Sequence, residues 1–335
     1  MKMPVSIALL SQLTFSSCGA QSDHRVSQEL GNELSERSKG GLALARFSES
    51  NHTLDLHFFD GRNEKLPLEI SGDLKVLATG RIAVIDMDST LRQRILNAAQ
   101  NGNGALLMEE FERFGGDVVL ISNSGRVERR SALSVNASVL AVSRDAKQFA
   151  FVGVPRGLSE SEIGIYIADF ESVHSRRLLA FGTDDPRKQH GARTRAELDW
   201  SPQGTSLLFS YRGAITELDV ASGLARKIAA GGSARWSPSG DQISFVGPKL
   251  EATLLQVSTG KTMAIDPGFE IPSAIEWSPD GRYLLIPEGE GSHVPYGCHW
   301  VYRLSDGAFY PVCDFHMINP LPNWIEVPST SEKRP

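Results

Sequence analysis

The fold is decided by the stretch Leu198-Asp199-Trp200-Ser201-Pro202-Gln203-Gly204, because it recurs along the chain. Two near-complete copies lie at 234–240 and 275–281, and a degraded copy lies at 140–146. A short run of β-forming residues follows each copy, as expected when a turn joins two strands. The copies share Trp200, Trp236 and Trp277, then Pro202, Pro238 and Pro279, and then Gly204, Gly240 and Gly281.

The residue types in this repeat suit a tight hairpin. Serine at the first turn position can accept a local backbone hydrogen bond, and proline fixes φ at the second position. Glycine at the fourth position adopts a positive φ at little cost. The tryptophan that precedes the turn is a large apolar side chain of the kind that fills space between packed sheets.

A second turn signature follows each hairpin, as at 218–223, 255–260 and 303–307. Two hairpins per repeat make a four-stranded antiparallel sheet, and repetition of such sheets every 40–50 residues or so is typical of a β-propeller. Residues 135–315 resemble the TolB-like propellers, a WD-repeat-like group with aromatic-Ser-Pro-Asp-Gly repeats. This resemblance implies an all-β propeller fold. It does not imply a role in the Tol system, because TolB carries an extra α/β domain that residues 21–41 are too few to form.

We predict six blades of four strands each within residues 42–330, with seven blades as the alternative. Four blades are expected at 135–181, 196–231, 232–267 and 272–315, and a fifth at 76–133 contains a long insertion. Residues 42–70 supply only three strands, so we expect 324–327 to provide the fourth. A C-terminal strand in the first blade would fasten the ring and remove open sheet edges.

The N-terminus has the layout of an export signal. Lys2 is followed by a largely apolar stretch and then by small residues, so we assign 1–18 as a signal peptide. Cys18 follows Phe15-Ser16-Ser17, which resembles a bacterial lipobox and implies lipidation at Cys18; cleavage after Ala20 is the alternative. Residues 19–41 are polar and are expected to be a flexible tether. We therefore predict an exported, periplasmic protein, with any membrane contact made through the lipid anchor.

The other two cysteines, Cys298 and Cys313, flank two β-runs joined by a tight turn. Counting outward from the turn places them nearly opposite on adjacent strands, so we predict a disulfide, with two buried free thiols as the alternative. The net charge of −6 provides no basic surface for nucleic acid. Hydrophobic residues make up 41% and charged residues 22%, as in a soluble globular protein.

All the long connections are expected on one side of the propeller, at 89–116, 154–163, 182–196 and 287–297. Loops carried on a rigid scaffold are where binding usually occurs. We predict a non-enzymatic scaffold that binds another envelope protein there, without a catalytic residue, metal or cofactor. The candidate binding residues are Arg92, Arg94, Glu109, Arg113, Asp184, Arg187, His190, Arg193, His293 and Tyr296.

Two alternative functions remain open. The first is a carbohydrate or small-ligand binder that uses the central channel. The second is a metal-assisted lyase or hydrolase. His190 and His293 are expected on the side of the long connections, and His299 and His316 lie near the last blade; three histidines that converge there could hold a metal. The spacing of these histidines matches no His-Glu-x-x-His pattern.

Overall fold

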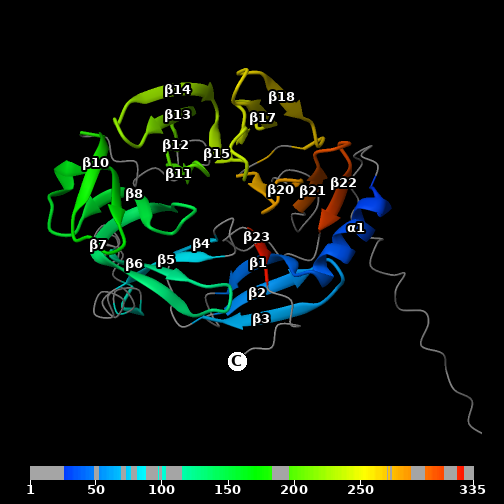
Figure 1. The fold of residues 1–335 in the computed structure, drawn as a ribbon, viewed down its shortest axis with the longest axis horizontal. Helices are drawn as coiled ribbons and strands as arrows, with labels where there is room; N and C mark the ends of the chain where they lie inside the picture. Colours follow the sequence, from blue (N-terminus) through cyan, green and yellow to red (C-terminus); the bar gives the residue numbers. More distant parts are fainter. Residues whose placement is uncertain are drawn as a thin grey trace, which may run out of the picture.

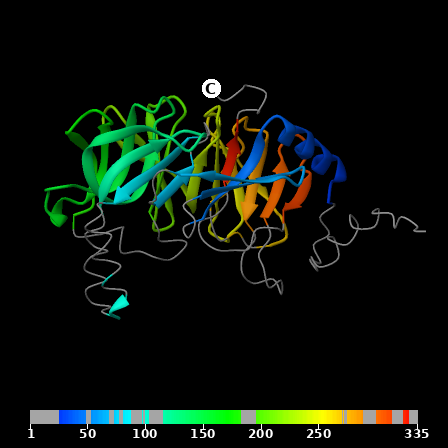
Figure 2. The ribbon, with the colours of Figure 1, turned by 90° about the horizontal axis from the view of Figure 1, so that it is seen from below.

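The computed structural model describes residues 26–48, 53–68, 73–76, 81–87, 97, 100–102, 115–182, 196–269, 271, 274–287, 299–312 and 323–327. These residues form five antiparallel sheets that surround a common axis (Figure 1). Seen edge on, the sheets make a flattened ring, and the N-terminal helix, drawn in blue, lies at its rim (Figure 2). The chain is therefore an all-β propeller, as predicted.

The sheets follow one another along the chain, except that the last strand joins the first sheet. The first sheet contains β23 (Asn323–Glu326), β1 (Leu42–Ser48), β2 (Thr53–Phe58) and β3 (Asn63–Pro67), in that order. The long sheet contains β4 (Asp73–Val76), β5 (Ile82–Met87), β6 (Gly116–Ile121), β7 (Val127–Val142), β8 (Gln148–Pro155), β9 (Gly164–Asp169) and β10 (Ser175–Ala180), with a short 3-10 helix at Glu160–Glu162.

The other three sheets have four strands each, ordered from the axis outward. They contain β11 (Glu197–Trp200), β12 (Ser206–Tyr211), β13 (Ala214–Asp219) and β14 (Ala225–Ala230); β15 (Gly232–Trp236), β16 (Gln242–Val246), β17 (Ala252–Gln256) and β18 (Thr262–Ile265); and β19 (Glu276–Trp277), β20 (Tyr283–Pro287), β21 (His299–Arg303) and β22 (Phe309–Val312).

The prediction of six blades, with seven as the alternative, is wrong: the described residues form five sheets. The blades expected at 76–133 and 135–181 are one seven-stranded sheet, because β7 continues through both for 16 residues. Its first half pairs with β6 and its second half with β8, and both pairings include Val135. Residues 127–142 contain no glycine or proline to end the strand, and register shifts bend it instead.

The ring closes as expected from the sequence. β23 pairs antiparallel with β1, with Leu42 opposite Glu326 and Ala45 opposite Asn323. The C-terminal strand thereby becomes the innermost strand of the N-terminal sheet, and both ends of the propeller share one hydrogen-bonded ladder.

The predicted hairpins are present, and each is held by its serine. The Ser201 amide donates to the Ser206 carbonyl (2.8 Å), and the Ser201 Oγ accepts from the Ser206 amide (3.0 Å). Ser143, Ser237 and Ser278 make the same two bonds in their own turns. The glycine in the fourth turn position adopts φ values of 71–79° in the three full copies.

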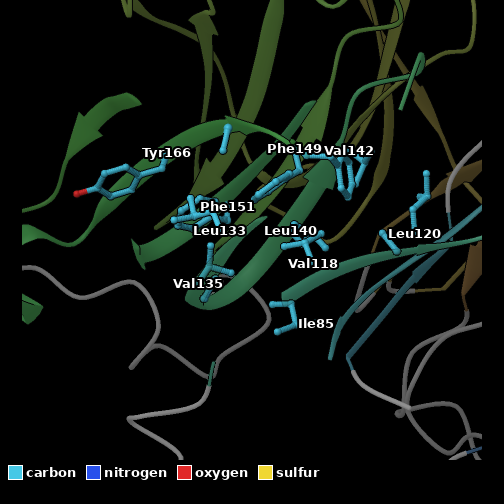
Figure 3. Close-up of a cluster of buried hydrophobic side chains, with 14 of the residues drawn as sticks. Ile85, Val118, Leu120, Leu133, Val135, Leu140, Val142, Phe149, Phe151 and Tyr166 are labelled. Carbon is cyan, nitrogen blue, oxygen red and sulfur yellow. The ribbon is translucent and has the colours of Figure 1, made fainter. Parts of the chain in front are cut away.

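The core lies between neighbouring sheets. Trp236 is 8% exposed and packs against Leu208 and Ile215 of the preceding sheet, so the repeat tryptophan fills space between sheets as predicted. Figure 3 shows another such cluster, in which Val118 from β6 and Phe151 from β8 take part. It lies between the two halves of the long sheet, which therefore pack against each other.

Part of the segment expected to be a flexible tether is helical in the structure. α1 (Gln28–Lys39) begins after Ser27, whose side chain accepts a hydrogen bond from the Leu30 amide as an N-cap. Leu30 and Leu34, four residues apart, share one face of the helix and are fully buried. Within the described part of the chain, no helix is long and apolar enough to cross a bilayer.

Candidate functional site

The two faces of the ring differ in the length of their connections. On one face, which we call the turn face, the described connections between strands are four or five residues long, as at 59–62, 201–205, 220–224 and 304–308. The opposite face, which we call the long-loop face, has connections of 28 residues (88–115), 16 residues (181–196), 11 residues (288–298) and 8 residues (156–163). In the last sheet, strand alternation places 304–308 and 288–298 at opposite ends. In the long sheet it separates 122–126 from 88–115, and 143–147 from 156–163.

Contacts between turns of different sheets place them on one face. The Arg144 guanidinium donates to the Pro238 carbonyl (2.9 Å), and the Gln203 amide group donates to the Ser239 carbonyl (3.0 Å). These bonds join turns of three sheets, 143–147, 201–205 and 237–241, on one face. Variation in length is therefore confined largely to the long-loop face, where a binding site can vary without disturbing the sheets.

The residues predicted for binding on the long-loop face are Arg92, Arg94, Glu109, Arg113, Asp184, Arg187, His190, Arg193, His293 and Tyr296, and all of them lie outside the described residues. The structure shows only the strand ends from which these connections leave. Met87 pairs with Gly116, and Pro287 pairs with His299, so both connections start and end at neighbouring strand ends. The role of these ten residues stays a prediction.

The predicted cysteine modifications also fall outside the described residues. Cys18, Cys298 and Cys313 are not described, so lipidation and the disulfide stay predictions. The described strands β21 and β22 end with His299 opposite Val312, one residue short of each cysteine of the predicted pair.

The innermost strands of three successive sheets carry a cluster of charged residues, which we call the channel cluster: Glu197 and Asp199 of β11, Arg235 of β15 and Glu276 of β19. The Arg235 Nη1 lies 2.8 Å from Glu197 Oε2, and its Nε lies 3.1 Å from Glu276 Oε1. The three side chains are only 13%, 19% and 22% exposed. One guanidinium thus connects three sheets beside the axis.

Electrostatics and backbone contacts fix this cluster. Burial alone would lower the pKa of Arg235, but the negative charges of Glu276, Glu197 and Asp199 outweigh it and raise the pKa. The Asp199 Oδ2 accepts a hydrogen bond from the Trp236 amide (2.7 Å). The cluster therefore holds a permanent positive charge between carboxylates, which suits cohesion of the ring better than proton transfer.

Of the four histidines considered for a metal, the structure describes only His299. His299 is 2% exposed on β21, and burial lowers its pKa to about 4. His190, His293 and His316 lie outside the described residues. Within the described part of the chain, no group of three or more His, Cys, Asp or Glu side chains could hold a metal ion.

The channel cluster was not predicted, although the sequence contains a signal for it. The residue directly before each repeat tryptophan is charged: Asp199, Arg235 and Glu276. Along the three repeats, the charge at this position is negative, then positive, then negative. In a propeller the same repeat position comes close together on neighbouring inner strands, so the alternation indicates ion pairs around the axis.

Comparison with known proteins shows the fold. No protein-family profile matches the chain, and no curated protein sequence matches it. Among solved structures, TolB from Acinetobacter baumannii superposes with a TM-score of 0.56 at 16% sequence identity over 85% of this chain. This chain spans 66% of the length of that protein. The resemblance to TolB-like propellers is thus confirmed for the fold.

Two further solved structures give weaker superpositions. A TolB candidate from Agrobacterium tumefaciens has a TM-score of 0.49 at 12% identity, covering 82% of this chain and 90% of its own. An auxiliary nutrient binding protein from Bacteroides thetaiotaomicron VPI-5482 has a TM-score of 0.39 at 15% identity, covering 55% of this chain and 43% of its own.

Proposed function

We propose that this chain is a non-enzymatic binding protein of the bacterial envelope that contacts a partner protein through its long-loop face. The observation that supports this function is the difference between the two faces. The described turns of the turn face have four or five residues, whereas the opposite face has connections of up to 28 residues. A rigid ring with length variation on one side is suited to presenting a binding surface.

The location in the envelope rests on the N-terminal sequence. Lys2, the apolar stretch after it and Cys18 form an export signal that ends in a lipobox-like cysteine. A lipid on Cys18 would hold the propeller at a membrane. Replacing this residue (Cys18→Ala) is expected to move the exported protein from the membrane fraction to the soluble periplasmic fraction. An unchanged membrane fraction would argue against the anchor.

The binding face is tested by site-specific photocrosslinking in intact cells. The crosslinker is placed at Arg92, Asp184 or Tyr296 in the long connections, and at Lys147 or Thr259 in exposed turns of the opposite face. We expect the same protein to be captured from at least two of the long connections and from neither turn. Capture from the turn face alone, or no capture from any position, would contradict the proposed function.

A further inference from the structure

Helix α1 lies at the junction where the ring closes. It contacts β22 of the last sheet and β1 of the first sheet, and Figure 1 shows it beside both. At its start, the Ser27 amide donates to the Phe309 carbonyl of β22 (2.9 Å). At its end, the Ser38 Oγ donates to the Leu42 carbonyl (2.9 Å) and accepts from the Phe59 amide (2.8 Å). The two ends of one helix are thus fixed to the two sheets that meet there.

Charged contacts attach the middle of α1 to the last sheet. The Glu33 carboxylate accepts from Arg303 Nη1 (2.5 Å), from Arg282 Nη2 (3.0 Å) and from the Tyr283 hydroxyl. Burial alone would raise the pKa of Glu33, but the hydrogen bonds from Tyr283 and Arg303 outweigh it and lower the pKa. The carboxylate is therefore held in its charged form by three partners from one sheet.

The outer strand of the last sheet, β22, differs from the outer strands β10 and β14 where α1 covers it. The outer strands β10 and β14 present Arg176-Arg177 and Arg226-Lys227 to solvent. By strand pairing, β22 has Tyr310 where β10 and β14 have Arg176 and Arg226. The Tyr310 ring lies against Gly31 of α1, where a Cβ would come within 2.4 Å of it. The contact between the Tyr310 ring and Gly31 indicates that α1 packs on the last sheet as part of the propeller.

A continuous set of contacts runs from α1 to the channel cluster. Tyr283, which donates to Glu33, stacks on Trp324 of the closing strand β23 with ring centroids 6.0 Å apart. The Trp324 indole N–H donates to the Glu276 carbonyl (3.2 Å). The Glu276 carboxylate in turn binds Arg235. A displacement of α1 can therefore be transmitted to Glu276 of the channel cluster through Tyr283 and Trp324.

We propose that α1 is a strap that keeps the ring closed by holding β23 in place, and that its release loosens the channel cluster at Glu276. The N-terminal segment runs directly into α1, so a force or a partner acting on that segment acts first on the strap. This coupling is independent of which face binds a partner. It assigns a conformational role to a segment that composition alone would describe as a linker.

Amide hydrogen exchange tests the strap, with the variant Glu33→Ala compared with Glu36→Ala. Glu36 is in the same helix, but its side chain is 71% exposed and pairs only with Lys39 among the described residues. We expect Glu33→Ala to speed exchange in β23 at least tenfold, with a smaller increase in β19 and none in β16. Glu36→Ala is expected to leave all three strands unchanged.

Two further variants keep the proposal testable if Glu33→Ala folds poorly. Arg282→Ala removes one of the three partners of Glu33 and is expected to speed exchange in β23 about threefold. Trp324→Phe keeps the ring but removes the indole N–H, so exchange should increase in β19 while α1 stays protected. Unchanged exchange in β23 after Glu33→Ala, or an equal increase in β16, would overturn the proposal, because the effect would then be absent or global.

Discussion

Replacing Arg235 with methionine should destabilise the propeller more than any exposed ion-pair deletion. Methionine keeps most of the length of the side chain but removes the charge that lies 2.8 Å from Glu197 and 3.1 Å from Glu276. Both carboxylates then remain beside the axis without their shared cation. Removing one partner from a fully buried ion pair costs about 3–5 kcal/mol, whereas an exposed pair is worth about 0.2–1 kcal/mol.

The exposure of these side chains sets the expected magnitude. Arg235 is 13% exposed and its partners are 19% and 22% exposed, so water screens the remaining carboxylates in part. We therefore expect Arg235→Met to lower the free energy of unfolding by about 2–3 kcal/mol. The matched control is Arg226→Met, because Arg226 lies 2.6 Å from Glu217 but is 73% exposed. That change should cost less than about 1 kcal/mol.

Equilibrium unfolding in urea measures both variants, and a third variant separates charge from packing. In Glu197→Gln/Arg235→Met/Glu276→Gln the two carboxylates that contacted Arg235 are neutral, and Asp199 keeps its hydrogen bond from the Trp236 amide, so at least half of the lost stability should return. If Arg235→Met costs no more than Arg226→Met, the channel cluster does not hold the ring together. If the triple variant is as unstable as the single one, lost packing and not charge explains the effect.

Three further predictions concern stability. His299 has a pKa of about 4 in the folded chain and about 6.5 in the unfolded chain. Between pH 7 and pH 4 the free energy of unfolding of the wild type should therefore fall by about 3 kcal/mol more than that of His299→Gln. Urea unfolding at each pH measures both proteins. Gly41→Ala should lower the melting temperature well below that of Gly61→Ala: both positions have positive φ, but a Cβ at Gly41 would lie 1.9 Å from the Val327 carbonyl oxygen, whereas Gly61 faces open space. Ser278→Ala should cost about 1–2 kcal/mol in urea, because the buried Tyr283 amide loses its bond to the Ser278 Oγ.

The sign of the pH effect follows from which state binds the proton. Burial disfavours the charged form of His299, so the folded chain stays unprotonated at this residue down to about pH 4. The unfolded chain takes up the proton as pH falls through about 6.5, and this uptake favours unfolding. Stability from this group is therefore present above about pH 6.5 and is lost as pH falls toward 4. A pH dependence equal in wild type and His299→Gln would show that His299 has no such role.

The hairpins could be predicted from the sequence because each of their residues has a local physical role. Ser201, Pro202 and Gly204 meet the requirements of one turn without help from distant residues, and the same holds in the other two copies. The closing strand could also be predicted, since an incomplete first sheet requires one more strand. Such inferences depend only on local conformation and on the need to pair strand edges.

The features that were missed depend on contacts between distant residues. Residues 28–39 are mostly polar, and their only strong apolar signal is Leu30 and Leu34, which is too weak to predict a docked helix. The predicted number of blades was wrong because residues 127–142 favour a strand throughout. Sequence periodicity cannot show whether one long strand belongs to two blades. In both cases tertiary packing decides what local preference leaves open.

The channel cluster and the strap supply directional contacts that the hydrophobic core between the sheets does not supply. Hydrophobic packing between sheets is not directional, and the closing sheet is held by only four residues of β23. Directional contacts are therefore most useful beside β23, and that is where Trp324 donates to Glu276 and stacks on Tyr283. Both of these contacts involve Trp324, which belongs to the closing strand. The contacts made by Trp324 therefore add directional support to the strand that closes the ring.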